Sequence, residues 1–338
     1  MLTADGNLTK MMLIDPYNRK LNYLRISITD RCNLRCLYCS PRHQIPKLSH
    51  EDILSYEEIL RLVKIAVQLG ISKVRITGGE PLVRKGVFEF IQALHQVDGI
   101  QDVSLTTNGV LLKDHVDALM SAGLHRINIS LDTLKPDKFK KITGVDAFDQ
   151  VWEGIQQAYQ GGLSPIKINT VALRHFNENE LEDIARLSFA YPFHFRFIEY
   201  MPIGITEEGM ASSLHTPEIK QRLTDQIGEL IPVEHQLSDG PAERFRFEGA
   251  AGEVGFISAM SHHFCHTCNR LRLTASGQLR SCLLSDHQED LKAPLRSGAS
   301  DEALSAIFLK AARMKGVQHG LTADAPRRIS GQMSSIGG

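Results

Sequence analysis

Short apolar segments alternate with helix-like segments over the first two hundred or so residues, and this alternation limits the folds open to the chain more than any other feature. Strands of a parallel sheet that is covered on both faces are short and rich in apolar and β-branched residues. Six segments have this character: residues 24–28, 73–77, 101–106, 126–130, 167–171 and 194–198. Helical spacing of apolar residues marks the segments between them, at 55–70, 88–95, 116–122, 148–159 and 178–190.

This order of elements predicts an α/β fold with right-handed crossovers and a parallel sheet. Six strand–helix units are too few to close an eight-stranded barrel, so we expect a partial, open (β/α)6 barrel of the TIM type. A doubly wound sheet is the alternative. Ser55 and Glu58 have the spacing of a capping box at the start of the first helix, and Gly70 suits its end.

The strand–helix order ends past Tyr200, and residues 202–215 resemble a loop. We expect an N-terminal tail at residues 1–20, the partial barrel at 21–215, an α+β extension at 216–326 and a mobile, Gly/Ser-rich tail at 327–338. Within the extension, residues 216–227 resemble a helix, and residues 244–248 and 253–258 resemble a hairpin.

Charge and hydropathy exclude two classes of partner. The formal net charge of −1 argues against general nucleic-acid binding, which needs a surplus of Lys and Arg. No apolar run approaches the roughly 20 residues that a membrane-spanning helix needs, and the N-terminus has no signal-peptide pattern. We therefore expect a cytoplasmic protein, in which six cysteines are more suited to metal binding than to disulfides.

The first three cysteines, Cys32, Cys36 and Cys39, form a C-x3-C-x2-C motif directly after the first predicted strand. Ligand sites of parallel sheets lie beyond the carboxyl ends of the strands. Three thiolates in one loop can hold a 4Fe–4S cluster and leave its fourth iron open. The alternative is a structural zinc site, which would need a fourth ligand such as His43.

The other three cysteines, Cys265, Cys268 and Cys282, have the spacing C-x2-C-x13-C. Zinc is the usual reading of a paired C-x2-C, with His262, His263 or His266 as the fourth ligand. The neighbouring Arg270 and Arg272 lie two positions apart, so on an extended segment both would point to one face. Paired guanidinium groups suit phosphate recognition and have no role in a structural zinc site, although a solvated basic strand is the alternative.

Two motifs resemble the radical S-adenosylmethionine (SAM) superfamily. The first is the C-x3-C-x2-C spacing with an aromatic residue, Tyr38, before the last cysteine. The second is Gly78-Gly79-Glu80-Pro81 at the end of the next strand, which alone would be an ordinary turn. The resemblance implies that SAM chelates the open iron of the first cluster, whose electron cleaves the sulfonium and releases a 5′-deoxyadenosyl radical.

The sequence Cys268-Asn269-Arg270-Leu271-Arg272 and the terminal Gly337-Gly338 narrow the resemblance to the GTP 3′,8-cyclases of molybdenum cofactor biosynthesis. Membership would imply a lyase with two 4Fe–4S clusters and SAM as cofactors. Its substrate would be GTP and its product (8S)-3′,8-cyclo-7,8-dihydroguanosine 5′-triphosphate. No Walker A loop occurs in the chain, so GTP would not bind as it does in P-loop proteins.

The resemblance also assigns roles to single positions. The SAM contacts fall on Tyr38, Gly79, Ser130 and Met201. The GTP contacts fall on Arg25, Arg75, Thr106, Lys167, Arg270, Leu271 and Arg272. Arg25, Arg270, Arg272, Gly337 and Gly338 are expected to take part in catalysis. The alternatives are that the charged side chains extend from strand ends into solvent and that the terminal glycines fray.

The family further implies an external electron donor, transfer of the product to the cyclic pyranopterin monophosphate synthase, and an assembly that can be a homodimer. Two other readings stay open at this point. Another radical SAM enzyme with an auxiliary cluster, such as a peptide-modifying enzyme, would be expected to carry more C-terminal cysteines. A non-catalytic metal-binding or redox-sensing module would give the Gly78-Gly79-Glu80 loop no role.

Overall fold

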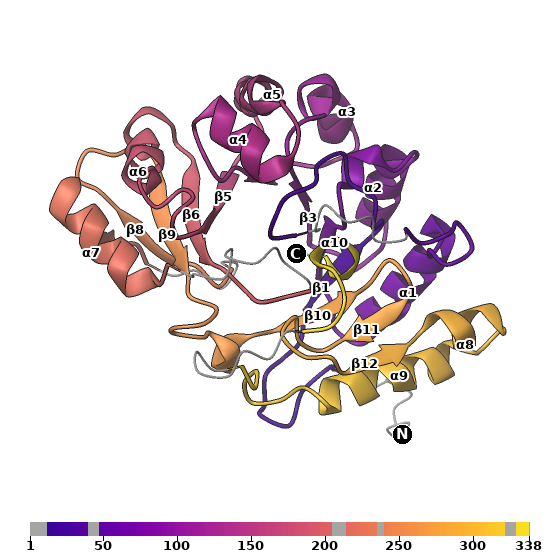
Figure 1. The fold of residues 1–338 in the computed structure, drawn as a ribbon. Coiled ribbons are helices and arrows are strands. Elements are labelled where there is room, and N and C mark those ends of the chain that lie inside the picture. Colours follow the sequence, from indigo (N-terminus) through magenta and orange to yellow (C-terminus); the bar gives the residue numbers. More distant parts are fainter. Residues whose placement is uncertain (1–11, 40–46, 205–213, 235–239, 322–328, 338) are drawn as a thin grey trace.

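The computed structural model describes residues 12–39, 47–204, 214–234, 240–321 and 329–337. These residues form one twelve-stranded mixed sheet in the order β12-β11-β10-β1-β2-β3-β4-β5-β6-β9-β8-β7. The sheet curves into an open arch, with helices α1 to α6 along its convex side (Figure 1). No helix of the described part is both long and apolar enough to cross a membrane.

Eight neighbouring strands of this sheet, from β10 through β1–β6 to β9, are parallel, and antiparallel pairs extend both ends. The barrel strands are β1 Tyr23–Ser27, β2 Lys73–Thr77, β3 Asp102–Thr107, β4 Ile127–Ser130, β5 Ile166–Ala172 and β6 His194–Glu199. The strands after them are β7 Ile231–Pro232, β8 Glu243–Arg246, β9 Glu253–Ile257, β10 Arg270–Leu273, β11 Gln278–Arg280 and β12 Gln288–Asp290.

Helices connect these strands and cover the outside of the arch. The helices of the barrel are α1 Tyr56–Gln68, α2 Val87–His95, α3 Val116–Ser121, α4 Pro136–Thr143, α5 Phe148–Gln160 and α6 Leu181–Ala190. The helices after the barrel are α7 Thr216–Gln226, α8 Lys292–Arg296, α9 Asp301–Arg313 and α10 Met333–Ile336. Three short 3-10 turns complete the described elements: η1 Pro81–Val83, η2 Lys113–His115 and η3 Cys265–Thr267.

Alternation along the strands gives the sheet two different faces. Leu24 and Ile26 of β1 are fully buried in the main hydrophobic core, which lies between the convex face and the helices. Arg25, between them, points to the opposite face because successive side chains of a strand alternate. The concave face therefore carries polar and charged side chains, and this asymmetry positions the candidate site.

The predicted α/β fold and partial, open barrel are confirmed, and the sequential order β1 to β6 rules out the doubly wound alternative. The predicted capping box is present, with Ser55 accepting from Glu58 N and Glu58 accepting from Ser55 N. The hairpin of β8 and β9 is also confirmed. Two strands of the C-terminal extension join the barrel sheet, which the sequence did not predict. β10 pairs with β1 and β9 pairs with β6, so the extension continues the sheet at both edges.

Both predicted tails contain packed residues. In the N-terminal tail Leu13 and Arg19 are buried, and Leu13 N donates to Leu69 O just after α1. Near the C-terminus, Ile329 pairs with Ile203 after β6, and α10 lies on the concave side of the arch (Figure 1).

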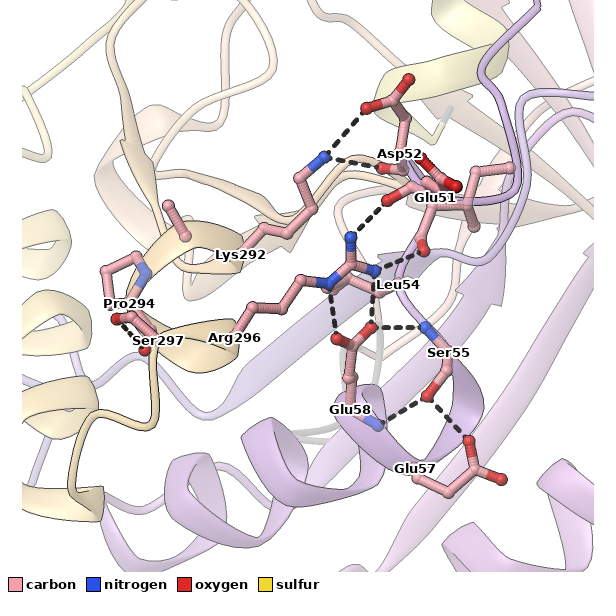
Figure 2. A network of polar contacts seen from close by, with 12 residues as sticks. Glu51, Asp52, Leu54, Ser55, Glu57, Glu58, Lys292, Pro294, Arg296 and Ser297 are labelled. Carbon is pink, nitrogen blue, oxygen red and sulfur yellow. Dashed lines mark hydrogen bonds and ion pairs between the residues drawn. The ribbon is translucent and has the colours of Figure 1, made fainter.

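A network of polar contacts joins the extension to the barrel at the start of α1 (Figure 2). The guanidinium of Arg296 in α8 donates to both carboxylate oxygens of Glu58, at 2.7 and 3.0 Å. Lys292 forms an ion pair with Asp52 at 3.2 Å. Glu58 also accepts from Ser55 N at 2.7 Å, so one carboxylate both caps α1 and binds α8. The cap of α1 and the contact between the barrel and α8 of the extension thus depend on the same residue, Glu58.

Replacing Ser55 by Ala should lower the free energy of unfolding by about 1 kcal/mol, because the cap of α1 loses its side-chain acceptor. Urea unfolding of the metal-free protein measures this change. Lys64→Ala, an exposed change on the same helix, serves as the control and should leave stability nearly unchanged. Equal stability of S55A and wild type would contradict the capping role.

Candidate functional site

The first cysteine triad lies in the loop that follows β1, at the carboxyl edge of the parallel strands. Cys39 N donates to Cys36 O, which closes a turn between the last two cysteines. Burial raises the pKa of Cys36 well above its usual value, and the neighbouring Cys39 and Cys32 sulfurs raise it further. Burial and Cys32 likewise raise the pKa of Cys39 to about 12. Three half-buried thiols that lie close enough to oppose ionisation suit a site whose positive metal atoms stabilise the thiolates.

The Gly78–Glu80 segment holds this loop in place. Gly79 N donates to Thr29 O at 2.7 Å and Glu80 N donates to Arg31 O at 2.8 Å. A Cβ atom on Gly79 would lie 2.2 Å from Arg31 O, so only glycine permits this approach. In the described structure the glycines therefore receive the backbone of the cysteine loop, a role that the sequence analysis did not predict for them.

Glu80 anchors the next strand end to the same loop. Its carboxylate is buried and accepts from Leu82 N at 3.0 Å, Thr107 Oγ1 at 2.8 Å and Asn108 N at 2.7 Å. Burial raises the pKa of Glu80 to about 7, against the effect of these donors. Asn108 in turn donates to Asn33 Oδ1 at 2.7 Å and lies 3.6 Å from Cys32 Sγ. The ends of β2 and β3 thus fix the position of the first triad.

Two of the four predicted SAM contacts share one small pocket with the first triad. Tyr38 and Ser130 line it together with Cys36 and Asp132. Tyr38 OH donates to Asp132 at 2.5 Å, and burial raises the pKa of Asp132 to about 6. Met201 lies apart from this pocket.

The other two predicted SAM contacts have different surroundings. Gly79 lies against the backbone of the cysteine loop, as described above. Met201 packs with Ile203, Ile336 and Cys282, beside the C-terminal helix and the second triad.

Three of the predicted GTP contacts form a row across adjacent strands. Arg25 of β1 is in register with Arg272 of β10 on one side and with Arg75 of β2 on the other. Residues in register on parallel strands point to the same face, which is the concave face here. Arg75 continues the row to Ser104 of β3, whose hydroxyl accepts from Arg75 Nε at 3.1 Å.

A second row on the same face contains the remaining strand positions. Thr106 of β3 is in register with Asn128 of β4, and Asn128 with Lys167 of β5. Two residues after Lys167, toward the carboxyl end of β5, Asn169 points to the same face and is in register with Arg196 of β6. Within the described part of the chain, Thr106 Oγ1, Asn169 Oδ1 and Arg196 Nε are buried without a hydrogen-bond partner. Buried polar atoms of this kind are costly and suit a ligand that satisfies them.

The concave face is strongly positive. Burial lowers the pKa of Arg25 well below its usual value, and repulsion from Arg272 and Arg75 lowers it further. Burial and Arg270 lower the pKa of Arg272 to about 10, and burial with Arg75 lowers that of Arg196 to about 9. Cations that destabilise one another in a buried concavity favour a ligand with several negative charges.

Two residues predicted to contact GTP occupy different environments. Arg270 at the start of β10 is in register with Tyr23, and its guanidinium stacks over the Phe264 ring at 4.8 Å. Leu271 is fully buried in the hydrophobic core of the opposite face, so only its backbone could contact a ligand on the concave side.

The second cysteine triad lies at the other end of the same strands. Cys265 begins η3 and Cys268 directly follows it, just before β10, and Cys282 follows β11, which runs back antiparallel to β10. Burial acts to raise the pKa of Cys268, but Arg270 and Lys315 outweigh it and hold this pKa at about 7. A five-residue strand such as β1 spans about 16 Å, which separates the two triads. Arg25 and Arg272 lie in the middle of their strands, so the arginine row lies between the two triads.

Neither triad has the arrangement of a single-ion site. Within the described residues, no three His, Cys, Asp or Glu side chains are grouped as the ligands of one metal ion. The three sulfurs of each triad nonetheless lie near one another, so that in each triad the pKa of one cysteine is raised by the other two. The donor set therefore fits a multi-iron cluster held by three thiolates.

The C-terminal segment reaches the arginine row. Arg272 donates to the carbonyl of Gly337, which has a positive φ of 84°. A Cβ atom on Gly337 would lie 2.3 Å from Thr77 Oγ1, so a side chain could not pass here. Gly338, the other predicted terminal residue, lies outside the described residues.

Sequence reasoning missed three cations at this site. Arg196 lies inside the predicted strand 194–198 and in register with Asn169, so strand alternation alone could have placed it on the concave face. Arg19 and Lys315 lie beside the second triad, and their contacts come from residues far away in the sequence. No local pattern marks either of them.

Comparison with protein families divides the chain at the end of the barrel. The Radical SAM superfamily matches residues 26–188, and Molybdenum Cofactor Synthesis C matches residues 193–321. A GTP 3′,8-cyclase of Pelotomaculum thermopropionicum is 47% identical over 96% of this chain and 99% of its own length. Another, of Thermodesulfovibrio yellowstonii, is 51% identical over 89% of this chain and 94% of its own length.

Solved structures show the same fold at low sequence identity. Streptococcus suis SuiB bound to the precursor peptide SuiA has a TM-score of 0.61 at 15% identity, covering 91% of this chain and 68% of SuiB. SuiB bound to S-adenosylmethionine has a TM-score of 0.59 at 16% identity, covering 86% and 69%. These likenesses support the radical SAM fold alone.

Replacing Gly79 by Ala should displace the cysteine loop, because the new methyl group would overlap Arg31 O. After anaerobic reconstitution, we expect the amount of bound iron per chain to fall by about half, because the second triad is unchanged. Iron and sulfide analysis measures this loss. Gly320→Ala is the control, since a Cβ atom there meets nothing within 4 Å. A G79A variant with wild-type iron content would contradict the packing role.

Replacing Glu80 by Gln should remove a pH dependence of stability. Folding raises the pKa of Glu80 from 4.5 to about 7, so the folded state favours the protonated carboxyl. The resulting contribution to the free energy of unfolding is fully present below pH 4.5 and is lost as pH rises to about 7. In urea unfolding of the metal-free protein over this range, stability should fall with pH more steeply for wild type than for E80Q. Parallel pH profiles would show that Glu80 does not titrate there.

Proposed function

The chain belongs to the GTP 3′,8-cyclase family of radical SAM enzymes in molybdenum cofactor biosynthesis, and we propose that its concave face binds GTP between two iron–sulfur clusters. The reaction converts GTP to (8S)-3′,8-cyclo-7,8-dihydroguanosine 5′-triphosphate. One observation carries the proposed binding mode. The in-register row of Arg272, Arg25 and Arg75 lies between the two cysteine triads.

We propose two 4Fe–4S clusters for each chain. Cys32, Cys36 and Cys39 would hold the first, and Cys265, Cys268 and Cys282 the second. SAM would contact Tyr38, Ser130, Gly79 and Met201. When bound, the first cluster and SAM would supply the radical chemistry that hydrogen abstraction from C3′ of GTP requires, and these side chains would hold them beside the substrate. An external electron donor would serve the first cluster, and the cyclic pyranopterin monophosphate synthase would take up the product.

The arginine row would bind the triphosphate. Arg25, Arg75 and Arg272 present planar guanidinium groups that can each donate two hydrogen bonds to phosphate oxygens. The negative charge of the triphosphate would also relieve the repulsion that lowers the pKa of Arg25 and Arg272. Binding would therefore be strongest for a ligand with several adjacent phosphates.

Side chains of the second row would orient the nucleoside. Thr106 Oγ1, Asn169 Oδ1 and Arg196 Nε are buried polar atoms on the concave face without a partner among the described residues, so a polar ligand would satisfy them. Lys167 and Arg196 line a pocket between β5, β6 and β9 that adds further positive charge. Rigid strands hold these groups, which favours the accurate placement of C3′ and C8 that cyclisation requires.

The Gly337 segment would close the site. Its carbonyl accepts from Arg272, and its backbone passes beside Ser27 and Thr77 at the ends of β1 and β2. A segment in this place would exclude water and oxygen from the space between the two clusters.

Anaerobic incubation with SAM, GTP and a strong reductant tests the proposed function. We expect release of 5′-deoxyadenosine that depends on GTP, together with the cyclised nucleotide. Arg272→Ala should lower turnover by at least about 10²-fold, since it removes a preorganised charge from the reacting ligand. The variant should still bind SAM.

Arg61→Ala is the matched control, because the contacts of Arg61 with the described residues are an exposed ion pair with Asp301 and a hydrogen bond to Ala299 O. Its turnover should equal that of wild type. GTP-independent release of 5′-deoxyadenosine, or full cyclase turnover in R272A, would overturn the proposed binding mode.

A further inference from the structure

A buried lysine outside every predicted motif contacts three parts of the second cysteine site. Lys315 follows α9 and is 3% exposed. Its ammonium donates to Ser281 O at 2.5 Å, to Arg270 O at 3.0 Å and to Cys268 Sγ at 3.5 Å. An ammonium has three N–H donors and no acceptor, so these three contacts use all of them.

The three acceptors belong to chain segments that must be held together for the triad to form. Ser281 directly precedes Cys282, whereas Arg270 lies two residues after Cys268. Lys315 therefore links the strand that leaves the Cys265–Thr267 turn to the segment that carries the third cysteine. The hydrogen bonds of β10 with β11 join Arg272 to Arg280 but do not reach the cysteines themselves.

A second buried cation holds the remaining cysteine. The guanidinium of Arg19 donates to the carbonyl of Cys265, and it also donates to Gly316 O at 2.6 Å and Val317 O at 3.1 Å. Asp15 pairs with Arg19 and keeps it in place. Residues 315–317 are thus linked to all three cysteines. Lys315 contacts the sulfur of Cys268 and the carbonyl of Ser281, which precedes Cys282. Arg19 bridges the carbonyls of Cys265 and Gly316.

We propose that Lys315 is a positioning residue for the second cluster, which deepens the proposed function and depends on it. The ammonium fixes the separation of Cys268 and Cys282 and places one positive charge against a cluster sulfur. Net charge and hydrogen bonds to the sulfurs set the reduction potential of an iron–sulfur cluster. A positive charge stabilises the more negative, reduced state, so Lys315 should raise the potential of the second cluster relative to a neutral residue.

The test isolates the second cluster in the full-length chain. In a background in which Cys32, Cys36 and Cys39 are all replaced by Ala, reconstitution should give about four iron atoms per chain. Lys315→Met keeps the length of the side chain and removes its charge and donors. In this background we expect K315M to lose most of that iron, or to keep a cluster whose potential is more negative.

The complete enzyme provides the matching measurement. K315M with all six cysteines should retain the first cluster, with its reductive cleavage of SAM. Its iron should fall from about eight toward about four atoms per chain, or the second cluster should remain at a more negative potential. Lys310→Met on α9 is the control, because Lys310 is exposed and, within the part of the chain that the structure describes, forms its ion pair with Glu289. The iron content of K310M and the reduction potentials of its two clusters should match those of wild type. Lys315→Gln replaces K315M in the same measurements if K315M is insoluble.

The outcomes separate the two proposals. If the background without the first triad binds no iron although it is folded, the second cluster itself is absent and the proposed function fails. If that background binds iron and K315M leaves its amount and its potential unchanged, the positioning role of Lys315 is wrong. Loss of both clusters from K315M in the complete enzyme would also overturn the role, since the lysine would then support the fold as a whole.

Discussion

Repulsion among buried guanidinium groups is the constraint on which the arrangement of this molecule depends. Arg25, Arg75 and Arg272 lie side by side on three adjacent strands, and the two outer guanidinium groups, with burial, lower the pKa of the central Arg25. Burial of several like charges is unfavourable unless an anion compensates them. The formal net charge of the chain is only −1, so this local excess reflects placement and not composition.

The pairing of β10 with β1 brings the arginines together and also positions them between the two cysteine triads. Because β10 comes from the C-terminal extension, a strand more than two hundred residues away in sequence completes the arginine row. The same strand begins just after Cys268, and β1 ends just before Cys32. One parallel pairing therefore places the two cysteine triads at opposite ends of the strands with the positive face between them.

Local patterns were sufficient to predict the barrel and both triads, but not the contacts between distant segments. The capping box at Ser55 and the alternation of β1 to β6 are written in neighbouring residues, so they were predicted correctly. Helix α4 was missed because it is short, rich in Lys and without a side-chain cap. The three-residue strands β11 and β12 carry too few residues for a periodic signal.

Two kinds of cation serve two purposes in the site, and their chemistry explains the division. The concave face uses arginines, whose planar guanidinium groups match the oxygens of a phosphate. At Lys315, the acceptors are two carbonyls and a sulfur that approach from three separate segments. A compact ammonium with tetrahedral donors can meet such a set, whereas a flat guanidinium directs its donors into one plane. Lysine is thus the cation that suits the junction behind the second triad, as arginine suits the ligand in front of it.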